Sequence, residues 1–299
     1  MSATNTICAI IVTYHPDFPI LDELLKKLSP QVAQIIIINN TATSELANQI
    51  QQKDIIIINP GKNIGLGAAY NQGIALAQKN NFEYVLLFDQ DSCPAENMVE
   101  ILYLAYQKLA QKNKIAVVGP NHVDSRTQKA SYTVQLAGCQ LKKTYCNLNN
   151  TMEYLPSLHI ISSGSLLALK NIKEIGLFDE TLFIDYVDIE WGLRAKSKGY
   201  KSYYICPAIL RHRLGENLVN FLGRKIPFYN PLRCYYTFRN AVILCKRPYI
   251  PFGWKIHVLY KTLQRYIFYI LYSSTKSQHI KMMSYGLWDG VVNTPQPHE

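Results

Sequence analysis

Short apolar runs alternate with segments of helical periodicity through the first part of the chain. The runs are rich in Ile and Val, are bounded by Asn, Pro and Gly, and cover residues 7–13, 32–38, 54–58 and 84–88. Such runs are typical of strands that are buried on both faces of a sheet. Each run is followed by a segment with helical periodicity, over residues 21–28, 43–51, 66–79 and 95–108. This alternation predicts an α/β fold with a parallel, doubly wound sheet, and residues 115–119 add a fifth strand.

The second half of the chain is less regular. Residues 121–170 are polar and β-prone, and an apolar run resumes at residues 160–169. We expect a helix over residues 183–198, because acids near its start and bases near its end match the helix dipole. Residues 203–206 predict a further strand, and from residue 228 the chain becomes basic, aromatic and helical.

Composition narrows the classes of function. The 299 residues carry a formal net charge of +10 and an isoelectric point of about 9.1, which suits nucleic acid, an anionic membrane surface or phosphorylated substrates. The sequence has no helix-turn-helix, zinc-finger or RNA-binding signature, so nucleic acid is not an expected partner. The apolar run at residues 7–12 is too short for a signal peptide, and no uncharged stretch is long enough to span a bilayer.

Cysteine usage bears on the cellular compartment. The seven cysteines are scattered, odd in number and without C-x-x-C spacing. This pattern predicts reduced, mostly buried thiols in a cytoplasmic protein.

Two carboxylates end the fourth apolar run. Asp89 and Asp91 are one residue apart, so alternation places them on the same side of an extended chain. Two hard oxygen ligands at the carboxyl end of a buried strand suit Mg²⁺ or Mn²⁺ that also holds a diphosphate. Ligands of open α/β sheets bind at this edge. Taken alone, Asp-x-Asp is more often a polar turn in which Asp91 or Ser92 caps the next helix.

The loop at residues 61–67 contains three glycines. A dinucleotide fingerprint would need a third motif glycine where Tyr70 stands, and a phosphate-binding P-loop would end in Gly-Lys-Ser/Thr, which is absent. Neither cofactor is supported. The glycines permit a close backbone approach to a ligand, and a plain tight turn explains them equally well.

Acids also gather where the helix at residues 183–198 begins. Asp185, Asp188 and Glu190 lie within six residues, which is more than capping needs, so one of them is a candidate general base. Acids at a helix start also serve the helix dipole alone. His212 by itself is an ordinary histidine, and it becomes a candidate third metal ligand beside Asp91.

In chain order the motifs are Thr13-Tyr14-His15-Pro16, Ile38-Asn39-Asn40-Thr41, Asn63-x-Gly65-x-Gly67-x-x-x-Asn71-x-Gly73, Asp89-Gln90-Asp91, Ser163-Gly164, Asp188-x-Glu190 with Arg194, and His212. Together they resemble the family 2 inverting glycosyltransferases, which have the nucleotide-diphospho-sugar transferase (GT-A) fold. The likeness covers residues 5–215. Residues 182–191 and 212–215, with Tyr235-Tyr236-x-x-Arg239-Asn240, resemble the rhamnosyltransferase branch, which builds O-antigen lipopolysaccharide and capsular polysaccharide.

The resemblance implies a role for each matching residue. Asp188 is implied as the catalytic base, and Asp91 with His212 as the ligands of Mg²⁺ or Mn²⁺. The implied donor-binding residues are Thr13, Tyr14, Asn39, Asn63, Gly65, Asp89 and Gln90. The implied acceptor-side residues are Ser163, Gly164, Asp185, Glu190 and Trp191. Two positions depart from the family: Asn39 stands where an Asp usually faces the pyrimidine, and Val187 stands where many relatives have Glu.

The resemblance also implies the reaction and the domains. It implies a metal-dependent inverting transferase that moves L-rhamnose from dTDP-β-L-rhamnose to a saccharide on polyprenyl diphosphate. The catalytic GT-A domain, with its mostly parallel Rossmann-like sheet, is expected over residues 1–225 and a helical extension over residues 226–299. Three alternatives stay open: a transferase of another nucleotide sugar such as a UDP-hexose, a sugar nucleotidyltransferase, and an inactive binding module.

The predicted extension is basic and aromatic. Lys and Arg recur through residues 224–288 with Phe, Tyr and Trp between them, and the acids after Glu216 are Asp289 and Glu299. Basic helices with aromatic-rich apolar faces can lie in a bilayer interface. This pattern predicts a protein peripheral to the inner face of the cytoplasmic membrane. The alternative is that these helices pack on the core or form a homodimer interface.

Overall fold

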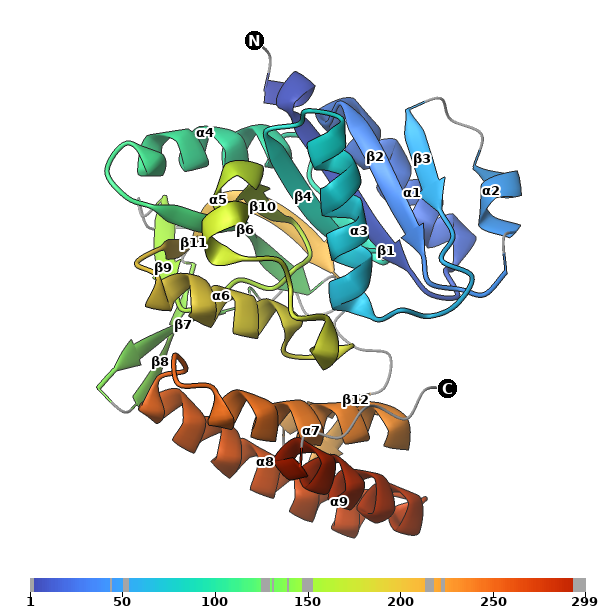
Figure 1. Ribbon diagram of the computed structural model, residues 1–299, viewed down its shortest axis with the longest axis vertical. Coiled ribbons are helices and arrows are strands. Elements are labelled where there is room, and N and C mark those ends of the chain that lie inside the picture. The colour runs from blue at the N-terminus through green and yellow to red at the C-terminus, as the bar shows by residue number, and fades with distance from the viewer. Residues whose placement is uncertain are drawn as a thin grey trace. The chain divides into compact units, whose positions relative to one another are not determined.

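A computed structural model describes residues 3–43, 45–50, 54–124, 130, 132–138, 140–146, 153–212, 218–221 and 224–292. Within these residues, a nine-stranded sheet runs in the order β3-β2-β1-β4-β10-β6-β11-β5, and β9 also pairs with β11 (Figure 1). Its strands are β1 (Ile7–Thr13), β2 (Gln34–Asn39), β3 (Ile55–Ile58), β4 (Tyr84–Asp89), β5 (Ser92–Pro94), β6 (Ile115–Asp124), β9 (Tyr154–Ser157), β10 (Ser165–Ala168) and β11 (Lys201–His212). The mostly parallel sheet confirms the predicted α/β class.

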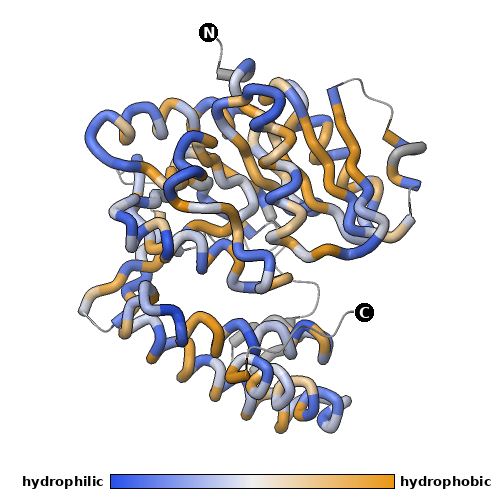
Figure 2. The backbone as a smooth tube through the Cα atoms, in the orientation of Figure 1, coloured by the Kyte–Doolittle hydropathy of each residue, from blue (hydrophilic) through white to orange (hydrophobic). Residues whose placement is uncertain are grey.

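The first four strands form the parallel part of the sheet. β1 pairs in parallel with both β2 and β4, and β2 pairs in parallel with β3. The helices between them are α1 (Phe18–Leu28), α2 (Glu45–Gln49), α3 (Leu66–Lys79) and α4 (Met98–Ala110). Helices cover both faces of these strands (Figure 2). Side chains on both faces are therefore buried, which explains why each strand is an uninterrupted apolar run in the sequence.

Alternate residues of β1 show how the two faces are covered. Ile7, Ala9 and Ile11 belong to one buried cluster with residues of α1 and α4. Ile10 faces the other side, where α3 approaches so closely that a Cβ on Gly73 would lie 2.5 Å from Ile10 Cγ2. Gly73 is therefore required for the close packing of α3 on the strand.

The second half of the sheet is mixed. β10 is antiparallel to its neighbours β4 and β6, whereas β11 is parallel to β6. Helices α5 (Leu169–Ile175) and α6 (Val187–Ser197) and the hairpin of β7 (Tyr132–Ala137) and β8 (Gln140–Tyr145) complete this part. The predicted β-prone stretch thus supplies strands, as expected.

Three predicted boundaries need correction. The strand predicted to end at residue 119 continues to Asp124, because β11 pairs with it over that length. Helix α4 starts at Met98 rather than residue 95, because β5 first pairs with β11. The helix predicted from residue 183 begins at Val187, because residues before it have left-handed backbone angles.

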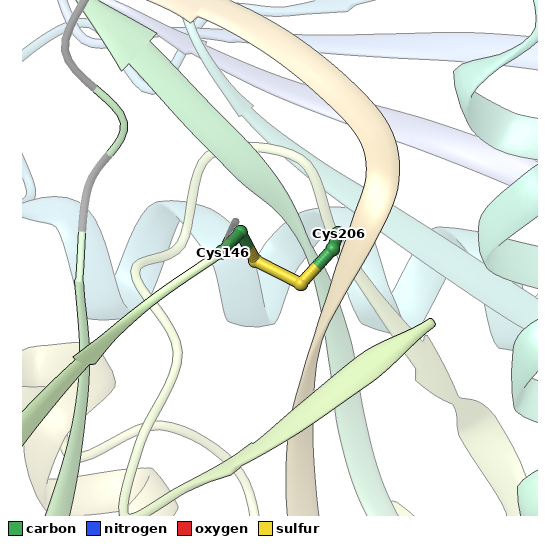
Figure 3. Close-up of a disulfide and its surroundings, with 2 residues drawn as sticks. All are labelled: Cys146 and Cys206. Carbon is green, nitrogen blue, oxygen red and sulfur yellow. A yellow bond between two sulfur atoms is a disulfide. The ribbon is translucent and has the colours of Figure 1, made fainter. Parts of the chain in front are cut away.

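One pair of cysteines forms a disulfide, so the prediction of reduced thiols is wrong for this pair. Cys146, which follows β8, and Cys206 in β11 have Cα atoms 5.4 Å apart and are separated by 60 positions (Figure 3). Because the two cysteines are far apart in the sequence, no short spacing between them predicted the disulfide. Cys8 and Cys234 are buried free thiols, and burial raises the pKa of Cys8 to about 12 and that of Cys234 to about 11.

The chain divides into two compact units. The first comprises residues 1–135, 143–181 and 187–213, and the second comprises residues 136–142, 182–186 and 214–299. The predicted domain division at residue 225 stays a prediction.

The second unit contains the helical region that was expected at the C-terminus. Its helices are α7 (Pro231–Lys246), α8 (Phe252–Tyr272) and α9 (Lys276–Val292), and β12 (Leu218–Phe221) pairs with β13 (Arg224–Pro227) before them. Helix α9 packs directly on α7, because a Cβ on Gly286 would lie 2.4 Å from Tyr235 O. In the part of the chain that the structure describes, no helix is long and apolar enough to cross a membrane.

Candidate active site

Three strands end together at the carboxyl edge of the sheet. β1 ends at Thr13, which pairs with Asn39 at the end of β2, and Val12 pairs with Asp89 at the end of β4. Parallel strands bring these ends to one edge, which is where open α/β sheets bind ligands. The structure thus gathers residues that are 26 and 76 positions beyond Thr13.

Gln90 joins the loops that follow β1 and β4. Its side-chain Oε1 accepts from Tyr14 N at 2.8 Å, and its Nε2 donates to Tyr14 O at 3.1 Å. The Tyr14 side chain is 42% exposed, and its ring meets the edge of His15 at 4.4 Å between centroids. An exposed aromatic ring held by its own backbone is available to stack on a planar ligand.

Asn39 has an internal role that the sequence did not predict. Its Nδ2 donates to Asn59 Oδ1 at 2.8 Å and to Thr43 O at 2.9 Å, and its Oδ1 accepts from Thr13 Oγ1 at 3.4 Å. The amide is 1% exposed and holds adjacent strand ends together. Its implied contact with the donor base stays a prediction.

The glycine-rich loop opens helix α3. Gly65 has a φ of 82°, and Asn63 Oδ1 accepts from Gly65 N at 3.0 Å. A Cβ on Gly67 would lie 3.0 Å from Asp179 O, so this glycine permits a close backbone approach. These contacts explain structurally why the loop contains glycines. The donor contact that the family resemblance implies for Asn63 and Gly65 is a separate prediction.

Asp188, the second residue of α6, has the most perturbed carboxylate of the site. Burial, with a smaller contribution from the negative charge of Asp89, raises its pKa to about 6. The backbone N–H groups of Ser162 and Ile189 oppose this rise, because they donate to Oδ2 at 3.1 Å and to Oδ1 at 2.8 Å. A carboxylate with this pKa is ionised at neutral pH and remains a useful proton acceptor.

A small cavity explains why Asp188 is poorly solvated. It measures about 10 Å³, close to the smallest space that holds one water molecule. Its polar lining comes from Asp188, Ser162 and Ser165, and the rest comes from residues such as Leu87, Phe178 and Trp191. A mostly apolar wall disfavours the charged carboxylate.

Tyr70 is a site residue that the sequence analysis missed. Its phenol is buried and donates to Asp89 Oδ1 at 3.3 Å. Burial raises the pKa of Tyr70 well above its usual value, with further contributions from the charges of Asp89 and Asp188. In the sequence this position was visible only as the absence of a motif glycine, so no signal marked it as polar chemistry.

Ser163 and Gly164 lie beneath the end of β4. Ser163 Oγ accepts from Asp89 N at 3.3 Å and contacts Ser92 Oγ, while His122 Nε2 donates to Ser163 O at 2.8 Å. Gly164 has a φ of 78°, and its N donates to Leu87 O at 2.7 Å. These buried contacts position the strand end, and a direct acceptor contact for either residue stays a prediction.

The implied metal ligands lie on adjacent backbone segments. Asp91 sits in the turn between β4 and β5, and Ser92 in β5 pairs with His212 at the end of β11. The side chain of His212 lies outside the part of the chain described here. Among the described residues, no three His, Cys, Asp or Glu side chains converge as a metal site. One carboxylate and one imidazole fit a cation that shares its coordination with a bound diphosphate.

The other acceptor-side residues have internal partners. Glu190 forms a two-point ion pair with Arg194, at 2.8 Å to Nε and 2.9 Å to Nη2. Trp191 Nε1 donates to Gly176 O at 2.8 Å. Asp185 belongs to the second compact unit, where it pairs with Arg233. An acceptor contact for these three residues stays a prediction.

Known proteins resemble this chain in sequence. The family description "Glycosyl transferase family 2" matches residues 8–176. The "dTDP-rhamnosyl transferase RfbF" of Shigella flexneri is 28% identical over 292 residues, which is 96% of each chain. The "Uncharacterized glycosyltransferase MJ1057" of Methanocaldococcus jannaschii is 22% identical over 280 residues, which is 89% of each chain.

Solved structures give the same fold at lower identity. S. aureus TarS 1–349 in complex with UDP-GlcNAc has a TM-score of 0.58 and 14% identity, over 97% of this chain and 82% of the TarS chain. GalNAc-T7 with UDP, GalNAc and Mn²⁺ has a TM-score of 0.60 and 13% identity, over 99% of this chain and 59% of the GalNAc-T7 chain.

The chain belongs to glycosyl transferase family 2 and has a GT-A-like fold. Within that family, its nearly full-length similarity to RfbF confirms the predicted likeness to the rhamnosyltransferase branch. It is therefore a glycosyltransferase.

The raised pKa of Asp188 predicts a pH-dependent cost to stability. Ionisation is disfavoured in the folded protein, so the stabilising effect of the neutral form is present below the usual pKa of 3.8 and is lost as the pH rises through about 6. Asp188→Asn should therefore gain roughly 1–3 kcal/mol relative to the wild type between pH 4 and pH 8. Urea unfolding at both pH values measures this difference. Exposed Asp54→Asn is the control and should show little change, and an equal change in both variants would contradict the burial of Asp188.

Proposed function

We propose that the protein is an inverting rhamnosyltransferase that uses dTDP-β-L-rhamnose and a lipid-linked saccharide acceptor in O-antigen or capsular polysaccharide synthesis. The proposed donor rests on the 28% identity with the dTDP-rhamnosyl transferase RfbF over 96% of both chains. The basic, aromatic C-terminal helices favour an acceptor at an anionic membrane surface. A UDP-hexose donor is the competing outcome of the test below.

Asp188 is the proposed catalytic base. It takes the proton of the acceptor hydroxyl while the hydroxyl oxygen attacks the anomeric carbon on the face opposite the diphosphate. The bond from this carbon to the diphosphate oxygen breaks in the same displacement, so a β-linked donor gives an α-linked product. The pKa of about 6 for Asp188 suits this role at neutral pH.

Asp91 and His212 are the proposed ligands of Mg²⁺ or Mn²⁺. A divalent cation supplies charge neutralisation for a leaving diphosphate. The carboxylate of Asp91 is the hard oxygen ligand that such ions prefer. Asp89, Tyr14 and Gln90 are proposed to orient the donor on the strand ends.

The donor is tested by the release of nucleoside diphosphate in the presence of candidate acceptors. We expect dTDP-rhamnose to be used in preference to UDP-glucose and UDP-galactose. If a UDP-hexose is used tenfold better, the rhamnosyl donor is wrong.

Asp188→Asn should lower the rate by about 10²–10⁴ and leave donor affinity nearly unchanged, because only proton acceptance is lost. If donor binding collapses while the rate per bound donor survives, Asp188 has a structural role only.

Metal dependence is tested at Asp91. Asp91→Ala should lose Mn²⁺-dependent donor binding, measured as the loss of the thermal shift that donor and Mn²⁺ together produce. Turnover should fall by several orders of magnitude, because the leaving diphosphate is no longer neutralised. The matched control is Asp54→Ala, an exposed carboxylate outside the site. Full activity of the wild type in EDTA would refute the proposed metal requirement.

Helix α8 offers a surface for the membrane. Large hydrophobic side chains at helical spacing are exposed along its whole length: Phe252, Ile256, Leu259, Tyr260, Leu263, Ile267 and Leu271. The buried residues Trp254, Val258, Phe268 and Tyr269 lie on the opposite face. We call the exposed set the α8 stripe.

The charge around the α8 stripe favours an anionic bilayer over a second copy of the chain. Helix α8 contains Lys255, Lys261 and Arg265 and no acidic residue. A two-fold contact between α8 helices would bring like charges together without carboxylates to pair with them. Anionic lipid supplies the missing negative charge and accepts the apolar side chains.

Vesicle flotation tests the α8 stripe. The full-length protein should float with vesicles that contain acidic phospholipid, and added salt should weaken this binding because it screens the basic residues. Leu259→Gln with Leu263→Gln should reduce flotation about tenfold or more, because apolar burial in the interface is lost. Leu104→Gln, an equally exposed position on α4, is the control. Flotation that is unchanged by the double substitution, or a dimer that it dissociates, would contradict the membrane proposal.

A further inference from the structure

The segment before α6 has a rare backbone conformation. Phe183, Asp185 and Tyr186 have φ angles of 60°, 59° and 64°, a left-handed region that residues other than glycine seldom adopt. Three such residues within four positions persist only where their surroundings hold them in place. Val187 and Asp188 are the next two residues along the chain.

Helix α7 holds this segment through the Asp185 carboxylate. Arg233 donates from Nη2 to Oδ1 at 2.9 Å and from Nε to Oδ2 at 3.4 Å, and Thr237 Oγ1 donates to Oδ2 at 2.6 Å. Arg233 and Thr237 are one helical turn apart on α7. Both carboxylate oxygens of Asp185 therefore have partners on one face of one helix.

Asn240 holds the backbone of the same segment. Its Nδ2 lies within hydrogen-bond distance of three carbonyl oxygens, those of Leu182 at 2.8 Å, Ile184 at 2.8 Å and Asp185 at 3.1 Å. Its Oδ1 accepts from Arg239 Nε at 3.1 Å and from Nη2 at 2.9 Å. Because the guanidinium fixes the oxygen side of the amide, the NH₂ group must face the carbonyls. Asn240 is fully buried and Arg239 is 1% exposed.

Aromatic contacts complete the attachment. Phe183 stacks on Tyr236 of α7, with ring centroids 4.8 Å apart and an interplanar angle of 16°. Helix α7 is itself fixed by α9, because a Cβ on Gly290 would lie 2.8 Å from Arg239 O. The helix that holds the segment therefore has little freedom to shift.

We propose that Asp185, Arg233, Thr237 and Asn240, together the loop clamp, are positioning residues for the transfer reaction. The inference rests on the proposed role of Asp188 as the base. The clamped turn is continuous with Asp188 through Val187, so loss of the clamp lets the residues that lead into Asp188 move. Asp188 needs both of its backbone hydrogen bonds, and movement of the adjoining backbone disturbs the geometry they require. This role differs from the acceptor contact that the family resemblance implies for Asp185.

Substitutions at Thr237 distinguish the effect of losing the hydrogen bond to Asp185 from the effect of changing the side-chain packing. Thr237→Val keeps the side-chain shape and removes the donor to Asp185, whereas Thr237→Ser keeps the donor and removes only a methyl group. Arg233→Gln removes the ion pair, and Lys276→Gln makes the same change of charge at an exposed position on α9.

Two measurements are made on each full-length variant. Hydrogen exchange of peptides that cover residues 182–189 reports the clamp without reference to activity. We expect exchange to rise about tenfold in Thr237→Val and Arg233→Gln and to stay at the wild-type level in Thr237→Ser and Lys276→Gln. Steady-state kinetics should show kcat about tenfold lower in the first two variants with donor KM nearly unchanged, because donor-binding residues lie elsewhere.

Each result decides between the possibilities. Unchanged exchange in Thr237→Val and Arg233→Gln would overturn the clamp itself. Faster exchange with wild-type kcat would overturn its role in positioning the base. A loss of kcat in Thr237→Ser equal to that in Thr237→Val would assign the effect to packing. If the wild type releases no nucleoside diphosphate from any donor, the proposed function fails, and the exchange measurement still decides whether the clamp exists.

Discussion

The carboxylate of Asp188 lies where burial and the charge of Asp89 oppose its ionisation, while two backbone N–H groups favour it. A fully solvated carboxylate would be a weak base, and an unassisted buried one would stay protonated at neutral pH. The balance between these effects gives a pKa of about 6. Catalysis by general bases is most effective when the pKa lies near the working pH.

Several distant parts of the chain maintain this balance. β10 enters the sheet antiparallel to β4, and this brings residues 162–165 beside the end of β4, where Ser162 N reaches Asp188. Tyr70 on α3 is buried and donates to Asp89. The turn before α6 begins with left-handed residues whose side chains and carbonyls are bound by α7. Each contact costs conformational freedom or desolvation, which is expected where strain is stored at a functional site.

The sequence predicts the first half of the fold well, because local signals suffice there. Four runs of apolar residues correctly predict β1 to β4, and their ends place Asp89 at the ligand-binding edge. The later strands were less predictable, since β10 lies between β4 and β6 only through long-range pairing. The disulfide between Cys146 and Cys206 was wrongly excluded for the same reason, as its partners are 60 positions apart.

The candidate site was predicted only in part. The polarity of Asp89 and Asp188 and their place in family motifs pointed to both residues. The effect of the Asp89 charge on the pKa of Asp188 was not predictable, because nearly one hundred positions separate the two residues in the sequence. Tyr70 carried no signal, because a tyrosine on the buried face of a helix resembles any core residue. Asn39 fits a ligand contact by motif, yet its amide forms hydrogen bonds with Thr13, Thr43 and Asn59.

The pH dependence of kcat/KM for the donor tests the role of Asp188 most directly, because this ratio reports the ionisation of the free enzyme. The predicted profile falls on the acid side with an apparent pKa of about 6, the value that burial and Asp89 give to Asp188. The same acid limb should be absent from the residual activity of Asp188→Asn. A wild-type profile that is flat down to pH 5, or an acid limb that persists unchanged in Asp188→Asn, would contradict the assignment of the base.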